Sequence, residues 1–391
     1  MVKNNIKYEF SLPMPYSIQD INKILDINNN VKNSQIKSLY ASLPSNCNLF
    51  TGFEQSRNYM FEYNDWAYWQ KLIKYTISQG CDFIYLLNSP RPLDITNINF
   101  PNQITKLEKL LEELQKIGVK KLRVASAQLS TYIAKHFKEF EILASTALEY
   151  KTIWEYQNFI AFHPEVKQIV PSHDVNKNFK LLSILRTRYP NIEIELMVNE
   201  GCLQGCPNRM LHESIDVEKR DIFNNDLCLS NGYSTLFCES VINRFPIACL
   251  AIGTHIFPWQ LEQYGKIGIN KFKLAGRDRY HNNLNNMIER FYAYIKGVED
   301  EEYIKNYALA NFTHHLNHNK LLNQILVKDY KRYLPDIKYF KKYGHLCASR
   351  CALECRYCYK CAENIEKVFK KKQEEMNKRT IPVCVVTKQT L

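Results

Sequence analysis

Short apolar runs recur along the chain and alternate with longer amphipathic segments. The runs are rich in Ile, Leu, Val and Phe, a composition typical of strands that are buried on both faces of a sheet. Eight of them are predicted to be strands: Ile6–Ser11, Ile36–Ser42, Phe83–Asn88, Leu122–Ser126, Phe140–Ser145, Gln168–Ser172, Ile192–Val198 and Lys271–Ala275.

The segments between these runs have the periodicity of helices. Leu107, Leu110, Leu111 and Leu114 follow the i, i+3, i+4, i+7 spacing of one helical face, which predicts a helix that packs on a sheet. Predicted helices include Ile18–Leu25, Trp66–Ser78, Ile104–Ile117, Asn178–Arg188 and Asn283–Gly297.

Eight strands, each followed by a helix or an insertion, predict a closed eight-stranded parallel β/α (TIM-like) barrel. The alternative is an open, doubly wound sheet, but the first strand is not followed by the glycine-rich phosphate turn that is common there. We expect residues 1–298 to form the barrel, with a cysteine-rich loop at 199–262. Residues 299–391 are expected to form a helical, basic, cysteine-rich extension.

Cysteine is the residue type that changes this picture most. Thirteen cysteines are present, and five of them fall between Cys347 and Cys361. Soft sulfur ligands crowded into so short a stretch are typical of iron–sulfur clusters and of zinc sites. A second, looser group consists of Cys202, Cys206, Cys228, Cys238 and Cys249.

The loop after the seventh strand is the first predicted metal site. Barrel enzymes carry their active sites on such loops, at the carboxyl ends of the strands. Cys202 and Cys206 are predicted ligands, and glycines within this segment would let the backbone wrap a metal closely. Cys238 is the favoured third ligand, with Cys228 and Cys249 as alternatives. The competing interpretation is a pair of buried cysteines that line the barrel mouth.

The terminal cysteines are the second predicted site. Cys351, Cys355, Cys358 and Cys361 are spaced closely enough for one loop to hold a 4Fe-4S cluster. Cys347 would then complete the cluster at the barrel mouth, with the tail folded across that face. A zinc nodule is the alternative for the tail. The spacing from Cys351 to Cys358 also occurs in radical S-adenosylmethionine enzymes, but there it follows the first barrel strand.

Charge and the chain ends suggest where the protein works and what it binds. Of the net charge of +12, +9 lies between residue 325 and the end, with 16 Lys or Arg against 7 Asp or Glu. These bases compensate an anionic cluster or, alternatively, contact nucleic acid through Lys370, Lys371 and Lys372 on a helix. The opening residues, MVKNNIKYEF, contain no apolar signal segment, and no apolar stretch is long enough to span a membrane. We therefore expect a cytoplasmic protein.

Polar residues at predicted strand ends are further candidates for the site. Asn88 follows the third strand and Asp174 the sixth, and we interpret Asp174 as a helix cap rather than a catalyst. Arg209 and His212 are stronger candidates because they are tethered beside Cys206. The pair His314 and His318 has metal-ligand spacing on a helix, but a solvated helical face is the preferred interpretation.

Two stretches of the chain resemble the peptidase U-32 family, also called collagenase-like. The first is Asn199-Glu200-Gly201-Cys202 with Cys206-Pro207, Arg209 and His212, and the second is Gly268 to Arg277, ending Lys273-Leu274-Ala275-Gly276-Arg277. The resemblance covers residues 36–297. It implies a barrel and a 4Fe-4S cluster held by four cysteines.

The resemblance also implies an activity. Family members hydroxylate ubiquinone precursors or RNA without oxygen, with prephenate implicated as the oxygen donor, so an RNA or a small aromatic metabolite is the expected substrate here. An electron-transfer or family-related partner protein is expected as well. The residues expected to line the mouth are Asn88, Glu200, His212, Lys273 and Arg277.

Each of these roles has an alternative. Lys273 and Arg277 would clamp a carboxylated donor, but Lys273 also fits a packed barrel layer and Arg277 an ion pair with the loop. At the level of the whole chain, the alternatives are a protease, as the family name says, and a non-catalytic iron–sulfur partner protein.

Overall fold

The computed structural model describes residues 8–42, 65–89, 100–199, 202, 204–207, 209–210, 254–276, 280–300, 337–343 and 357–379. Eight strands in this part of the chain close into a barrel in sequence order, and every neighbouring pair is parallel. The strands are β1 (Tyr8–Pro13), β2 (Ser34–Ala41), β3 (Asp82–Leu87), β4 (Lys121–Val124), β5 (Glu141–Ala144), β6 (Val166–Ile169), β7 (Glu193–Met197) and β8 (Lys271–Lys273). The predicted fold class is confirmed.

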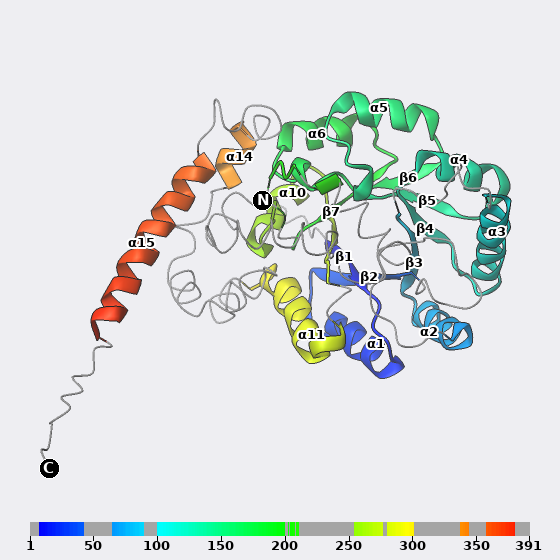
Figure 1. Ribbon diagram of the computed structural model, residues 1–391, viewed down its shortest axis with the longest axis horizontal. Coiled ribbons are helices and arrows are strands. Elements are labelled where there is room, and N and C mark those ends of the chain that lie inside the picture. The colour runs from blue at the N-terminus through cyan, green and yellow to red at the C-terminus, as the bar shows by residue number, and fades with distance from the viewer. Residues whose placement is uncertain are drawn as a thin grey trace, which may run out of the picture.

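Helices surround the barrel on its outside (Figure 1). They are α1 (Ile18–Leu25), α2 (Trp66–Ser78), α3 (Phe100–Lys116), α4 (Ala127–His136), α5 (Ile153–Phe162), α6 (Phe179–Arg188), α10 (Leu261–Gly265) and α11 (Tyr280–Gly297). Short 3-10 turns connect some of them: η1 (Asp26–Asn30), η2 (Thr146–Leu148), η3 (His173–Val175) and η4 (Pro258–Gln260).

Side chains at strand ends start several of these elements. Ser126 accepts a hydrogen bond from the Leu129 amide and caps α4, and Asn178 caps α6 in the same way. Thr152 and Glu155 form a complete capping box at the start of α5. The caps fix the points at which the helices begin, and so fix the ends of the loops that carry polar residues at the barrel mouth.

Two apolar clusters divide the core. The larger one fills the layer between the strands and the helices. The smaller one consists of Tyr40, Ile84, Leu86 and Leu143, which alternate along β2, β3 and β5 with residues of the larger cluster. Because successive side chains of a strand point to opposite faces, this second cluster lies inside the barrel.

Ion pairs occupy the amino-terminal end of the barrel. Nζ of Lys271 lies 2.8 Å from carboxylates of both Glu9 and Glu193, and Lys121 pairs with Asp82 at 2.7 Å. Glu9 is the second residue of its strand, and the other four residues are the first of theirs. Such ion pairs do not mark this end of the barrel as a reaction site. The loops that carry candidate chemistry emerge at the carboxyl ends of the strands.

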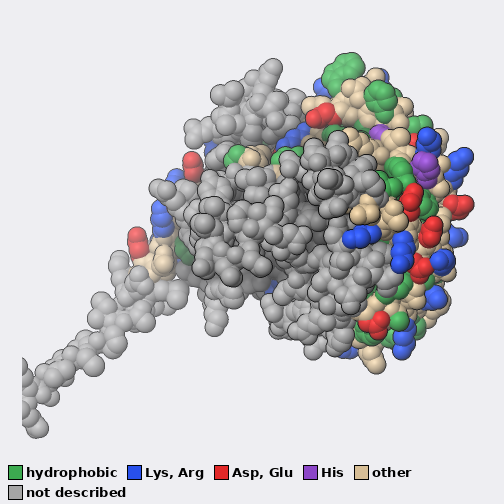
Figure 2. Space-filling model, turned by 45° about the vertical axis from the view of Figure 1, so that its right-hand side comes forward, with side chains coloured by type: hydrophobic (Ala, Val, Ile, Leu, Met, Phe, Trp, Pro, Cys, Tyr) green, Lys and Arg blue, Asp and Glu red, His purple; other side chains and the backbone are tan. Residues whose placement is uncertain are grey.

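The carboxyl-terminal extension is described at two helices, α14 (Ile337–Tyr343) and α15 (Tyr357–Arg379). Lys370, Lys371 and Lys372 lie on α15, as predicted, and α15 extends away from the barrel (Figure 1). No helix in the described ranges is long and apolar enough to cross a membrane. On the face shown in Figure 2, acidic and basic side chains are interspersed over the described surface.

Candidate functional site

The loop that carries Cys202 and Cys206 leaves the barrel after β7. Its first residue, Asn199, exchanges two hydrogen bonds with the backbone of Ala275 beyond β8, at 2.6 and 3.0 Å. The returning chain pairs with the end of β7, because the Ile256 amide donates to the Val198 carbonyl at 2.9 Å. Both ends of the loop are therefore fixed at the carboxyl-terminal mouth of the barrel, as predicted.

Cys202 is held through its backbone. Its carbonyl oxygen accepts hydrogen bonds from the amide of Thr254 at 3.0 Å and from Oγ1 of Thr254 at 3.1 Å. The buried side chain of Asn176 donates in turn to the carbonyls of Thr254 and Met197, at 3.0 and 2.9 Å. This links Cys202 to β7 while its thiol stays partly exposed.

Cys206 is held by Asp174, at the start of η3. Oδ1 of Asp174 accepts the Gly205 amide at 2.8 Å and lies 2.9 Å from Nη1 of Arg209. The Asp174 carbonyl accepts the side-chain amide of Gln204, also at 2.8 Å. Gly205 has a φ of +65°, a conformation that favours glycine in so tight a turn.

A second buried carboxylate, Glu149, completes this network. Oε2 of Glu149 accepts the Ser172 hydroxyl at 2.8 Å and lies 3.6 Å from Nη1 of Arg209. Its Oε1 lies 4.0 Å from Nδ1 of His173. Among the described residues, Glu149 is the only one other than glycine with a positive φ, at 54°. Strained backbone of this kind persists where surrounding contacts impose it, and it is concentrated at functional sites.

The charges of the network shift one another's pKa values. Burial raises the pKa of Asp174, but the Arg209 charge, the Gly205 amide and Lys151 outweigh it, so the pKa is lowered. Burial lowers the pKa of Arg209, and the nearby negative charges of Cys202, Asp174 and Glu149 raise it above its usual value. The site therefore holds ionised partners across the neutral pH range.

Inside the barrel lies a second polar network. Nη1 of Arg123 is 2.6 Å from Glu195, whose other oxygen accepts the Ser11 hydroxyl at 2.5 Å, and Arg123 also donates to Gln168 at 2.8 Å. All four side chains are buried. Burial raises the pKa of Glu195, but the charges of Arg123 and Lys273 together with its hydrogen bonds lower it overall.

Lys273 is the predicted site residue that the structure places within this interior. It is buried, and its Nζ lies 4.4 Å from the centre of the Tyr40 ring, within the range of a cation–π contact. The Tyr40 hydroxyl donates to the Leu274 carbonyl at 2.6 Å, which fixes the ring. Asn88 is buried just beyond β3. The other predicted mouth residues, Glu200, His212 and Arg277, lie outside the described residues.

The terminal cysteines are described in part. Cys358 and Cys361 lie in the first two turns of α15 rather than in a loop, about one helical turn apart and so on one face. Cys358 is buried and Cys361 is partly exposed. Burial and the neighbouring Cys358 raise the pKa of Cys361 to about 11. Cys238, Cys347, Cys351 and Cys355 lie outside the described residues, as do His314 and His318.

Aromatic contacts attach this helix to the barrel mouth. Tyr357 stacks on Tyr339 of α14, with ring centres 3.8 Å apart. Phe340 of α14 lies under the ammonium group of Lys177, 4.9 Å from the ring centre. Lys177 lies two residues after the end of η3, and its charge partly offsets the raised pKa of Cys361. The segment from Asp174 to Lys177 thus contacts the cysteine loop on one side and the terminal helices on the other.

The interpretation of Asp174 as a helix cap is wrong. The cap of η3 is Ser172, whose hydroxyl accepts the Asp174 amide at 3.4 Å, and this leaves the Asp174 carboxylate to bind the loop. Glu149 and Lys151 were not recognised from the sequence at all. Their signal was positional: both follow β5, the strand next to β6, so their side chains meet those that follow β6.

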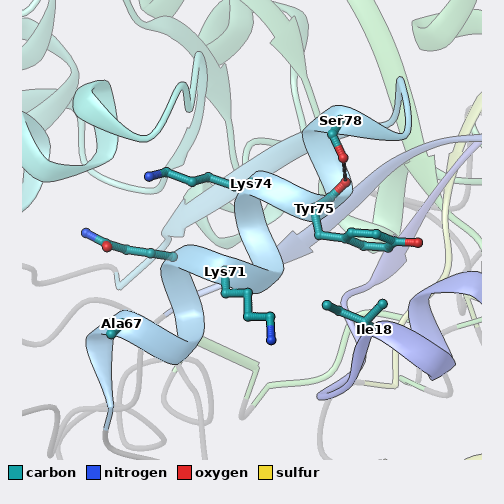
Figure 3. A pocket seen from close by; sticks show the side chains of 7 residues that line it. Ile18, Ala67, Lys71, Lys74, Tyr75 and Ser78 are labelled. Carbon is teal, nitrogen blue, oxygen red and sulfur yellow. Dashed lines mark hydrogen bonds between the residues drawn. The ribbon is translucent and has the colours of Figure 1, made fainter.

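One surface groove lies apart from the mouth. It has a volume of about 520 Å³ and is lined by Ile18 of α1 and by α2 residues that include Lys71, Lys74 and Tyr75 (Figure 3). The Ser78 hydroxyl at its edge is bonded to the Tyr75 carbonyl at 2.7 Å. None of its lining residues belongs to the networks described above, so we do not assign it to the site.

Comparison with known proteins gives structural likeness only. No family model matches the sequence, and no curated protein matches it. Among solved structures, the U32 peptidase Mk0906 is similar, with a TM-score of 0.43 and 11% identity over 71% of this chain and 95% of that chain. The N-acetylneuraminate lyase from Fusobacterium nucleatum has a TM-score of 0.35 and 12% identity over 94% of this chain and 99% of that one. The first of these structures is that of a U32 peptidase, the family that the two sequence motifs resemble.

Proposed function

We propose that this chain is an iron–sulfur enzyme whose cluster is held at the barrel mouth by Cys202, Cys206 and Cys238. The observation that carries the proposal is the pair of partly exposed thiols on a loop that is anchored at both ends to the carboxyl ends of the strands. In barrel enzymes this is where the reacting groups are placed.

The donor chemistry of the loop fits such a cluster. Two cysteines lie four residues apart on a turn that Gly205 permits, and the buried Arg209, three residues after Cys206, would supply a cation to balance thiolate charge. Within the described residues, no three His, Cys, Asp or Glu side chains gather as a complete metal site. The remaining ligands of the proposed cluster therefore come from residues outside those ranges, with Cys238 as the proposed third.

The proposed reaction is oxygen-independent hydroxylation, or a related modification, of an RNA or a small aromatic metabolite. A bound cluster supplies or accepts single electrons. The residues of the chain bind and orient: Lys273 and Arg277 hold the carboxylates of a co-substrate such as prephenate, and Asn88 contacts the substrate. His212 and Glu200 exchange protons with it. The position of Lys273 as the last residue of β8, at the carboxyl end of the barrel, supports its part.

We also propose a second metal at the terminal cysteines, held by Cys351, Cys355, Cys358 and Cys361, with Cys347 serving the barrel-mouth cluster. Two observations support it. Cys358 and Cys361 share one helical face, and their helix is attached through α14 to Lys177 at the mouth. A 4Fe-4S cluster and zinc both suit four thiolates.

The test is metal analysis of anaerobically purified protein, with sulfide counting and electron paramagnetic resonance. Two clusters give about eight irons per chain, and a single cluster with a zinc nodule gives about four irons and one zinc. Cys202→Ser and Cys206→Ser should each lose the iron of the mouth. Cys81→Ala is the matched control. Cys81 is buried at the start of β3, so this variant should retain all of the iron.

Function is tested on RNA and metabolites from cells with and without the chain, by mass spectrometry for the gain of one oxygen atom. Iron-free protein as purified, or full iron in Cys202→Ser and Cys206→Ser, would refute the proposal. Cleavage of gelatin or casein that survives removal of iron would instead show a protease.

A further inference from the structure

Cys206 lies between two residues that bind the same carboxylate. Gly205 precedes it and donates its amide to Oδ1 of Asp174 at 2.8 Å, and Arg209 follows it with Nη1 at 2.9 Å from that oxygen. The turn closes on itself as well, because the Arg209 amide donates to the Cys206 carbonyl at 3.3 Å. One side chain at the end of β6 therefore fixes the backbone on both sides of this cysteine.

The other contacts of Asp174 and Arg209 hold them in place. Oδ2 of Asp174 lies 2.9 Å from Nζ of Lys151, and the Asp174 carbonyl accepts the amide of Gln204 at 2.8 Å. Arg209 reaches a second carboxylate, Glu149, at 3.6 Å. Asp174 and Arg209 are each only 3% exposed. Ion pairs that are buried on both sides keep their geometry better than exposed pairs, whose long side chains stay mobile in water.

Arg209 also supplies charge to the metal loop. Arg209 is buried and lies three residues after Cys206 in the same turn, where its amide donates to the Cys206 carbonyl at 3.3 Å. A cluster bound by thiolates is anionic, and reduction makes it more so. A fixed buried cation beside it favours both the assembly of the thiolates and the reduced state.

We infer that Asp174 and Arg209 are positioning residues of the barrel-mouth metal site: Asp174 fixes the turn that presents Cys206, and Arg209 supplies the cation that balances the bound thiolates. Neither is a ligand. The inference rests on the proposed function, in which Cys202 and Cys206 bind the metal.

Three variants of the full chain separate position from charge. Asp174→Asn preserves the shape of the side chain but removes the charge that pairs with Arg209. Arg209→Gln removes the cation, and Arg209→Lys retains it without the forked donor. The matched control is Lys121→Gln, which removes a partly exposed ion pair with Asp82, at 2.7 Å, at the opposite end of the barrel.

The measurements are iron and sulfide content, the rate of iron loss to a chelator, and the midpoint reduction potential followed by electron paramagnetic resonance. We expect Asp174→Asn to weaken iron retention by about 10- to 100-fold, the usual cost of losing a group that orients a ligand. Arg209→Gln should lower the reduction potential, Arg209→Lys should restore it, and Lys121→Gln should leave both quantities near those of the wild type.

Each outcome bears on one of the two proposals. If Asp174→Asn and Arg209→Gln match the wild type in iron retention and potential while Cys202→Ser loses iron, the positioning role is refuted and the metal site stands. If Cys202→Ser and Cys206→Ser keep their iron, the proposed function itself fails. If Arg209→Gln does not fold, Arg209→Lys and Asp174→Asn still decide, since a purely structural role predicts the wild-type potential in every variant that folds.

Discussion

The buried pair of Arg123 and Glu195 allows the sharpest prediction of stability. The two side chains are 0% and 2% exposed, their charged atoms are 2.6 Å apart, and Ser11 donates a further hydrogen bond to Glu195. Lys273 also acts on Glu195 through its charge. Glu195→Gln keeps the size of the side chain but leaves two cations in the barrel without this carboxylate.

The expected cost follows from two independent arguments. Charge centres about 4 Å apart attract by roughly 4 kcal/mol at the effective dielectric constant of about 20 that suits protein sites. Removal of one partner of a buried pair costs about 3–5 kcal/mol in measured cases, because the other charge is left buried without compensation. We therefore expect Glu195→Gln to lower the free energy of unfolding by about 3–5 kcal/mol.

Urea denaturation followed by circular dichroism measures this change, and the slope of the transition shows whether unfolding remains comparable between variants. Glu193→Gln is the matched control. That side chain pairs with Lys271 at 2.8 Å but is 49% exposed, so the expected loss is below about 1 kcal/mol. Equal losses in the two variants, or a loss below about 1 kcal/mol for Glu195→Gln, would refute the reasoning.

The same pair predicts the direction of the pH dependence. The pKa of Glu195 is lowered in the folded state, chiefly by Arg123 and Lys273 against the effect of burial. A carboxyl group of this kind contributes stability that is present above its unfolded pKa and is lost as pH falls through its folded pKa. The wild-type advantage over Glu195→Gln should therefore be full at neutral pH and disappear in acid.

Two smaller predictions follow from local contacts. Burial and the adjacent Asp82 raise the pKa of Cys81 to about 12, so Cys81 should resist alkylation by iodoacetamide in the native protein at about pH 8 and react after unfolding; labelling of the native protein would contradict this. Thr152→Ala removes the capping box of α5 and should cost about 1 kcal/mol in urea denaturation, whereas Thr131→Ala, at an exposed site within α4, should cost much less. Equal costs would show that the cap contributes nothing.

The strands were predictable because parallel strands that are buried on both faces are continuous apolar runs. The eight predicted runs coincide with β1 to β8, although most extend past the observed ends. Ser126, Ser145 and Ser172 were assigned to strands, yet each caps the element that follows. A serine after an apolar run satisfies both patterns, and only its backbone geometry tells which of them applies.

The polar network at the mouth could not be read from periodicity. It joins three separate segments, represented by Glu149, Asp174 and Arg209, through ion pairs that no spacing encodes. The barrel order supplies the missing link, because residues that follow neighbouring strands meet at the mouth. Cys202 and Cys206 were found from the sequence since cysteine pairs are chemically conspicuous, whereas a buried aspartate resembles any helix cap until its partners are known.

One short segment connects the two groups of cysteines. Asp174 holds the turn that carries Cys206, and three residues later Lys177 lies over Phe340 of α14, the helix whose Tyr339 stacks on Tyr357 of α15. The segment from Asp174 to Lys177 begins within the 3-10 turn η3, which Ser172 caps, and its Asn176 reaches Thr254, the residue that holds Cys202. Contacts toward both groups of cysteines thus start from one short stretch of the chain. That arrangement gives the proposed pair of metal sites a shared physical basis, since a displacement of this stretch would act on both cysteine groups together.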